Sequence, residues 1–143
     1  MIGKLLVDTN VVSEMMHPQM HPAVVRWLDR MEADNLFLAS TSLAELRFGV
    51  AILPTGQRRT NLSASLDHLL TSLFLGRVLA FDALTAEQFG ILVSGARLRG
   101  WPIDIADGQI AAIAAVHGFA VATRNTGPFE AAGVAVVNPW EGA

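Results

Sequence analysis

The sequence predicts an α/β domain with a mostly parallel five-stranded sheet flanked by helices on both faces. Short segments rich in β-forming residues alternate with helical patterns along the whole chain. Most of these segments are unbroken apolar runs, which is typical of strands that are covered on both faces. Helical patterns separate the successive strands, and such crossover connections join parallel strands.

Five apolar segments are predicted as strands. They are Lys4–Val7, Leu36–Ala39, Arg77–Phe81, Phe119–Thr123 and Val134–Val137. Two helices are expected after each of the first three strands, and one short helix after the fourth. No internal repeat, low-complexity tract or linker interrupts this order, so residues 1–143 are expected to form a single domain.

Local signals place the helices between these strands. Pro22 stands where proline is tolerated in a first turn and opens a helix over Ala23–Met31. Serine or threonine followed three residues later by Glu or Gln has the spacing of a capping box, which predicts helix starts at Ser42 and Thr85. Two further helices are expected over Gln57–Phe74 and Asp104–His117.

Composition and charge exclude several classes of protein. Of the 143 residues, 52% are hydrophobic and 16% are charged, which excludes intrinsic disorder. The absence of cysteine excludes a disulfide scaffold, a thiolate zinc site and a cysteine nucleophile. A net charge of −3 argues against a general DNA-coating protein, because phosphate binding requires a surplus of positive charge on the surface.

The chain carries no signal for a membrane or for export. No stretch reaches the roughly 18 uninterrupted apolar residues that a membrane span requires. Asp8 ends the N-terminal apolar run before a signal-peptide core could form. We therefore expect a cytoplasmic protein without a membrane segment, whose surplus apolar surface meets another protein, with self-association as the default.

Polar side chains gather at the predicted carboxyl edge of the sheet, where ligands bind in open parallel folds. They follow strands directly or lie in the first turn of a later helix, and they are Asp8, Glu45, Asp104, Asp107, Arg124 and Asn125. Positions at strand ends and helix starts face the same edge, so the topology brings several of these side chains together.

A cluster of carboxylates without His or Cys suits a hard divalent cation such as Mg²⁺ or Mn²⁺. Such a cation activates water and neutralises the charge that develops on a phosphate. Asp8, Glu45 and Asp107 together carry −3, so one divalent ion leaves −1. A phosphodiester would then need a second metal or a nearby arginine, for which Arg124 and Arg47 are candidates by position.

Each acid also has a purely structural interpretation. Asp8 can be an ordinary N-cap after a strand, and Glu45 can complete the capping box with Ser42. Asp104 and Asp107 can complement the positive end of a helix, with Asp104 the better N-cap. The convergence of the acids on one edge is what favours a site.

Other catalytic arrangements find no support. The four histidines have no metal-ligand spacing, and the three tryptophans are expected to be packing anchors. The serines have no histidine arrangement for a hydrolase triad, and no Gly-rich phosphate-binding loop is present.

Taken together, these residues resemble the PIN-domain family, in particular the VapC-type (FitB-like) toxins of bacterial toxin–antitoxin pairs. The similarity runs from about Leu5 to Trp140. The segments that carry it are Leu5–Glu14, Thr41–Val50, Asp107–Ala112, Ala122–Asn125 and Val136–Trp140.

The resemblance implies a parallel sheet between layers of helices and an endoribonuclease that needs Mg²⁺ or Mn²⁺. It also implies a homodimer that is inhibited by a small DNA-binding antitoxin, which would occupy a hydrophobic groove lined by the helices after the first two strands. An antitoxin tail would place a basic side chain in the acidic pocket. On the family pattern, Asp8, Glu45 and Asp107 match the first three acidic positions.

The fourth acidic position departs from the family. Some members carry Asp where this chain has Asn125, and others carry it three residues later, where this chain has Pro128. Asn keeps an oxygen ligand but loses a charge, so a second metal is expected to bind more weakly. Asp104 is an extra acid, and it could replace the missing charge only if its helix begins later than predicted.

The leading hypothesis is therefore a toxin that hydrolyses RNA through metal-activated water, with Asp8, Glu45 and Asp107 as catalytic and metal-binding residues. The alternative is a catalytically degenerate PIN domain that acts as a dimeric binding module with an antitoxin partner. A phosphatase with Asp8 as nucleophile ranks lowest, because the second Asp of such enzymes is replaced by Asn10.

Overall fold

The computed structural model describes residues 3–141. One parallel sheet runs through it in the order β3-β2-β1-β4-β5. The strands are β1 (Leu5–Val7), β2 (Leu36–Ala39), β3 (Val78–Leu79), β4 (Ala120–Ala122) and β5 (Val136–Val137). The helices are α1 (Thr9–Met15), α2 (Pro22–Arg30), α3 (Ser40–Ala51), α4 (Gln57–Ser72), α5 (Ala83–Leu98), α6 (Ile105–His117) and α7 (Thr126–Ala131), with a 3-10 turn at Ala33–Asn35.

The predicted α/β fold and parallel sheet are confirmed, and every strand lies within its predicted segment. Three residues of β1 pair on both sides, so Leu5 lies between Leu36 of β2 and Ala120 of β4. The edge strands are shorter than predicted, and N–H groups that flank them bond outside the sheet. After β3, for example, the N–H of Phe81 bonds to Ser40 Oγ at 3.2 Å.

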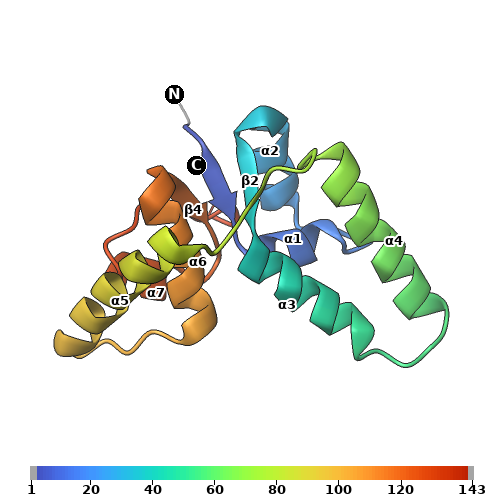
Figure 1. Ribbon diagram of the computed structural model, residues 1–143. Helices are drawn as coiled ribbons and strands as arrows, with labels where there is room; N and C mark the ends of the chain where they lie inside the picture. The colour runs from blue at the N-terminus through green and yellow to red at the C-terminus, as the bar shows by residue number, and fades with distance from the viewer. Residues whose placement is uncertain (1–2, 142–143) are drawn as a thin grey trace.

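Two apolar cores cover the two faces of the sheet. Leu5 and Val7 of β1 belong to a core shared with α1, α2, α3 and α4, whereas Leu6 belongs to a core shared with α6 and α7. Figure 1 shows the two groups of helices on either side of the sheet, with α3 and α4 to the right and α5, α6 and α7 to the left. Coverage on both faces explains why the strands are unbroken apolar runs.

Both capping-box predictions are wrong. α3 begins at Ser40 without a side-chain cap, so Ser42 lies inside the helix and is fully buried. α5 begins at Ala83, and its cap is Asp82, which accepts a hydrogen bond from the Thr85 N–H at 3.0 Å. Spacing alone does not show which residue begins a helix. At α3, the helix follows β2 without an intervening loop. Glu45 therefore does not cap α3.

The start of α6 is as predicted. Asp104 is the N-cap and accepts a hydrogen bond from the Asp107 N–H at 2.8 Å. Gly118 ends the helix in the left-handed conformation that glycine adopts at little cost. Inside α6, Gly108 lets α5 approach closely, because a Cβ at this position would lie 2.6 Å from the Phe89 ring.

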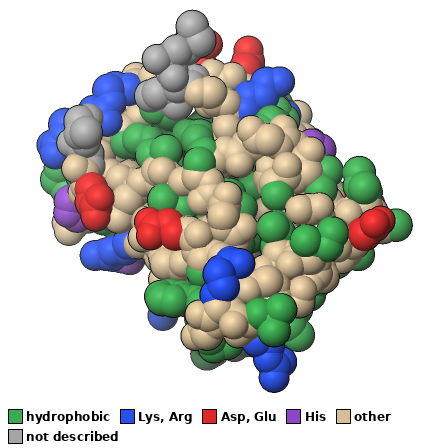
Figure 2. All heavy atoms as spheres, turned by 90° about the vertical axis from the view of Figure 1, so that its left-hand side faces the viewer, with side chains coloured by type: hydrophobic (Ala, Val, Ile, Leu, Met, Phe, Trp, Pro, Cys, Tyr) green, Lys and Arg blue, Asp and Glu red, His purple; other side chains and the backbone are tan. Residues whose placement is uncertain are grey.

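The outer surface of α5 exposes large apolar side chains at seven-residue intervals. Leu84, Ile91 and Leu98 are 61%, 59% and 88% exposed, respectively. Figure 2 shows the side of the molecule on which α5 lies, with hydrophobic side chains at the surface among charged ones. Within residues 3–141, none of the helices combines the length and the apolarity needed to cross a membrane.

Candidate metal-dependent nuclease site

Asp8 lies directly after the central strand, and hydrogen bonds hold both its backbone and its side chain. Its backbone N–H extends the sheet by bonding to the Ala122 carbonyl at 2.9 Å, and its side chain is the N-cap of α1. Oδ1 accepts a hydrogen bond from the Thr9 N–H at 2.8 Å, and Oδ2 accepts one from Thr123 Oγ1 at 2.9 Å. The residue is only 5% exposed, so the carboxylate has one fixed orientation. The capping and functional interpretations of Asp8 are therefore compatible.

Thr123 links three polar groups beneath the site and was missed by the sequence argument. Its hydroxyl is buried, donates to Asp8 Oδ2, and accepts hydrogen bonds from the Asn125 N–H at 3.0 Å and from Asn10 Nδ2 at 3.3 Å. The available signal was a hydroxyl residue at the end of an otherwise apolar strand. Thr123 thereby connects the loop after β4 to the carboxylate after β1.

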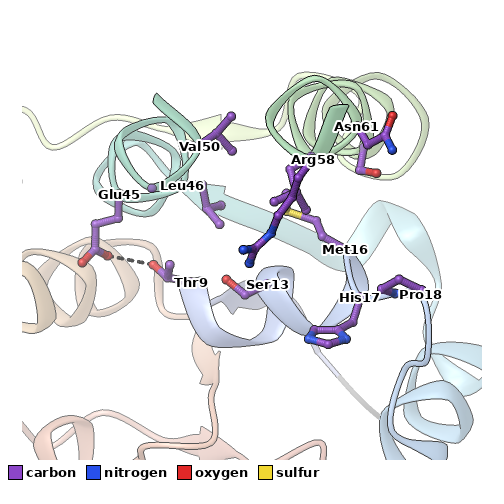
Figure 3. A pocket seen from close by; sticks show the side chains of 13 residues that line it. Thr9, Ser13, Met16, His17, Pro18, Glu45, Leu46, Val50, Arg58 and Asn61 are labelled. Carbon is purple, nitrogen blue, oxygen red and sulfur yellow. Dashed lines mark hydrogen bonds between the residues drawn. The ribbon is translucent and has the colours of Figure 1, made fainter. Parts of the chain in front are cut away.

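Glu45 faces the same edge from the first turns of α3. Its Oε1 accepts a hydrogen bond from Thr9 Oγ1 at 2.7 Å, and its side chain is exposed. Figure 3 shows this bond and the position of Glu45 on α3, opposite Thr9. Because α3 starts at Ser40, Glu45 projects from the helix toward α1 instead of folding back to cap it.

Asp107 is half-buried, and its pKa reflects neighbouring negative charge. Partial burial, followed by the charge of Asp104, raises the pKa of Asp107 to about 6, and the charges of Asp8 and Glu45 push it in the same direction. Burial also raises the pKa of Asp8, although its hydrogen bonds oppose this shift. Carboxylates from three separate segments therefore lie near one another, and the neighbouring negative charges disfavour the ionised forms of Asp8 and Asp107.

A cavity of about 450 Å³ joins the predicted residues and is called the acidic cavity below. Its lining comprises Asp8, Thr9, Asn10, Ser13, Glu14, His17, Glu45, Asp107, Arg124, Asn125 and Trp140. The three matched acids and Asn125 thus come together as predicted. Ser13 carried no site prediction, and His17 was not expected to belong to a metal site. Thr9 and Ser13 lie four residues apart on α1, and His17 follows two residues after the end of that helix.

Two other predicted groups lie outside this cavity. Asp104 is the exposed N-cap of α6 and does not line the acidic cavity. The helix does not begin later than predicted, so the condition under which Asp104 could replace the missing fourth acid is not met. Arg47 points elsewhere, since its guanidinium pairs with Asp67 at 2.7 Å and lines a separate cavity. Arg124 is the candidate arginine that the structure places beside the acids.

The donor set fits a hard divalent cation. Asp8, Glu45 and Asp107 offer only oxygen ligands, and their mutual repulsion is the kind that a cation relieves. Over residues 3–141, no three acidic or histidine side chains stand close enough to form a ready-made cage. Mg²⁺ commonly keeps several waters and takes only one or two carboxylates directly, so a full protein cage is not required.

A second cavity, called the apolar groove below, has a volume of about 700 Å³ and runs between α1, α3 and α4. Its walls include Met16, Leu46 and Val50, and Arg58 of α4 extends toward α1 (Figure 3). Thr9, Ser13, His17 and Glu45 line both cavities. The apolar groove therefore leads directly into the acidic cavity, and it lies between helices that follow the first two strands, as predicted.

Comparisons with known proteins agree with this geometry. The PIN domain family model matches residues 5–134. The chain is 44% identical to the VapC ribonuclease Y4jK of Sinorhizobium fredii over 97% of its own length and 99% of the relative. It is 45% identical to toxin FitB of Neisseria gonorrhoeae over 95% and 98% of the two chains.

The chain is also similar in three-dimensional structure to a solved protein. The structure of FitAB bound to an IR36 DNA fragment matches with a TM-score of 0.89 at 43% identity, covering 95% of each chain. Sequence identity at this level over nearly the whole chain, together with the matching sheet and site, leaves one assignment: the protein belongs to the PIN-domain family.

Proposed function

We propose that this protein is the endoribonuclease toxin of a bacterial toxin–antitoxin pair, with residues 1–143 forming a single PIN domain. The observation that carries the proposal is the convergence of Asp8, Glu45 and Asp107, from three separate segments, on one cavity at the carboxyl edge of the sheet. Relatives about 44% identical that are named ribonuclease and toxin support it. Because its RNA substrate lies there, we expect the protein to act in the cytoplasm.

Asp8 and Asp107, with Glu45 beside them, are the residues that would hold Mg²⁺ or Mn²⁺. When bound, such an ion lowers the pKa of water and neutralises charge on a phosphate. Asn125 contributes an oxygen without a charge at the edge of the cavity, so we expect one tightly held ion rather than two. Asp104 acts through the helix start and through its charge on Asp107.

The chain's own residues hold the acids in place for this chemistry. The Thr123 hydroxyl and the Thr9 N–H each bond to one oxygen of Asp8, which fixes the orientation of its carboxylate beside the acidic cavity. Thr9 Oγ1 holds Glu45 toward the same space. Held donors of this kind reduce the reorganisation needed when charge develops on the phosphodiester.

An antitoxin is the expected partner, and the apolar groove supports this proposal. A solved relative contains FitAB bound to DNA, and toxin FitB is 45% identical to this chain. An amphipathic segment laid along Met16, Leu46 and Val50 could pass a basic side chain into the acidic cavity, because the two cavities share lining residues. Such a segment would block RNA and compete with the metal.

The exposed stripe on α5 supports a homodimer. Leu84, Ile91 and Leu98 form a row at seven-residue spacing, which is the pattern of a helix that packs on another helix. Burying such side chains from two copies removes apolar surface from water on both sides. A dimer would also bring arginines of two protomers to a shared surface despite the net charge of −3.

The alternative of a degenerate binding module is favoured by one observation, the uncharged Asn125 at the fourth acidic position. Cleavage of bulk small RNA by the purified protein separates the two functions. We expect wild type to cleave with manganese and not with chelator, and Asp107→Asn to be inactive although folded and dimeric. A folded wild-type dimer that leaves every RNA intact under both conditions would favour the binding module.

A further inference from the structure

The acidic cavity presents an electrostatic problem for RNA. Four carboxylates line it, from Asp8, Glu14, Glu45 and Asp107. Phosphate groups are anionic, so these carboxylates repel the substrate. A single divalent ion offsets only part of their charge, and something else must attract a phosphate to the rim.

Arg124 is the one Lys or Arg side chain that lines this cavity among residues 3–141. It follows Thr123 directly at the end of β4, and its backbone N–H bonds to Asn10 Oδ1 at 3.3 Å. These contacts fix the backbone of Arg124 to the same network that holds Asp8. The start of the side chain is thus set relative to the carboxylates.

The guanidinium of Arg124 is held by an aromatic ring. Its Cζ lies 5.0 Å from the centroid of Trp140, within the range of a cation–π contact. Trp140 is held in turn, because its side chain packs against the apolar core and its backbone N–H donates to Asn138 Oδ1 at 3.0 Å. The ring limits the orientations of a side chain that would otherwise be flexible.

Within residues 3–141, no carboxylate forms a salt bridge with the guanidinium of Arg124. Of the salt bridges between described residues, one joins Arg47 to Asp67 and the other joins Arg77 to Asp34, and neither includes Arg124. Arg124 is exposed at the cavity rim. A planar guanidinium with free donors beside an aromatic ring is suited to phosphate, which it contacts through two parallel hydrogen bonds.

We propose that Arg124, oriented by Trp140, binds a phosphate of the RNA at the rim of the acidic cavity and so places the scissile bond over the carboxylates. Arg124 is then a substrate-binding residue, and Trp140 is a positioning residue that acts through it. This inference rests on the proposed nuclease function. It adds the residue whose positive charge reduces the repulsion between the carboxylates of the cavity and the RNA phosphates.

The salt dependence of RNA binding tests the proposal. The probe is a fluorescein-labelled 20-nucleotide single-stranded RNA of mixed sequence, followed by anisotropy with calcium in place of manganese and checked on a gel for intactness. Each phosphate contact on a single strand contributes about 0.7 to the slope of log Kd against log salt concentration. Arg124→Gln is expected to lower the slope by about 0.7 and to raise Kd roughly tenfold, the effect of losing one charged hydrogen bond.

Three matched variants separate charge from orientation. Arg124→Lys should keep the wild-type slope with a weaker Kd, since the charge stays and the planar contact is lost. Trp140→Leu should also keep the slope and raise Kd about twofold to fivefold, which is the size of a lost cation–π contact. Arg47→Gln, which removes an arginine outside the cavity, should leave both quantities unchanged.

Steady-state cleavage with manganese gives a second readout. Arg124→Gln should raise KM more than it lowers kcat, whereas general damage to the fold would lower the thermal midpoint as well. A wild-type slope and Kd for Arg124→Gln, or an equal loss in Arg47→Gln, would overturn the inference. Absence of cleavage by wild type would overturn the proposed nuclease function instead. The RNA-binding assay in calcium would still test the role of Arg124 by itself.

Discussion

Replacing Thr123 with valine removes one hydroxyl from beneath the site and keeps the side-chain volume. The hydroxyl is fully buried and donates to Asp8 Oδ2 at 2.9 Å. A hydrogen bond to a charged group contributes about 1.5–3 kcal/mol, and the Asn125 N–H also loses its acceptor. We expect Thr123→Val to lower the free energy of unfolding of the metal-free protein by about 2 kcal/mol at pH 8.

The cost should depend on pH, and its sign follows from the pKa of Asp8. Burial raises the folded-state pKa of Asp8 above 3.8, and the Thr123 hydrogen bond opposes that rise. Ionised Asp8 therefore destabilises the folded state, and stability is lost as pH rises through the folded pKa. Without the hydroxyl the folded pKa rises further. The cost of Thr123→Val should be complete at pH 8 and should shrink toward pH 4, where Asp8 becomes protonated.

Urea unfolding in chelator at pH 8 and near pH 4 measures this cost. Thr41→Val is a matched control, because the Thr41 hydroxyl donates to a neutral acceptor, Gln109 Oε1, at 2.7 Å. Its cost should be about 1 kcal/mol at both pH values. A cost for Thr123→Val below about 0.5 kcal/mol, or one as independent of pH as that of the control, would refute the role given to Thr123.

Three further predictions concern α5 and α6. Asp107→Asn should stabilise the metal-free protein by about 1 kcal/mol at pH 8, after a discount for solvent screening, because the raised pKa of about 6 shows that ionisation of Asp107 is unfavourable in the folded state. Urea unfolding should show that this gain in stability fades below pH 6. A loss of stability at pH 8 would contradict the prediction. Gly108→Ala should destabilise by about 1–3 kcal/mol because its Cβ would lie 2.6 Å from Phe89, whereas Gly90→Ala on open α5 surface should not lower the thermal midpoint. Leu98→Glu, at a side chain that is 88% exposed, should shift sedimentation from dimer to monomer without unfolding, and an unchanged dimer would exclude the α5 interface.

Much of the fold could be predicted because burial on both faces leaves a plain signature in the sequence. The strand segments are unbroken apolar runs, and each was located correctly. Helix starts were harder. Ser42 and Glu45 have the spacing of a cap, but the chain enters α3 directly from β2, and Ser42 is buried inside the helix. Local spacing does not contain that tertiary information.

The acids of the site could be predicted from topology, whereas their supporting contacts could not. Asp8, Glu45 and Asp107 each stand at a strand end or helix start, and the sheet brings them to one edge. Thr123 looks like an ordinary strand residue until β4 is placed beside β1. Arg47 and Arg124 were equal candidates by position. The structure separates them, because Arg124 lines the acidic cavity whereas Arg47 pairs with Asp67 beside another cavity.

Manganese binding measured by calorimetry tests the central claim most directly, namely that these carboxylates form one metal site. Wild type should bind Mn²⁺, and Asp8→Asn should bind it far more weakly, because the variant loses a buried charged ligand that faces the acidic cavity. Asp104→Asn, which removes an acid outside that cavity, should still bind. Equal binding by wild type and Asp8→Asn, with both folded, would contradict the assignment of the site.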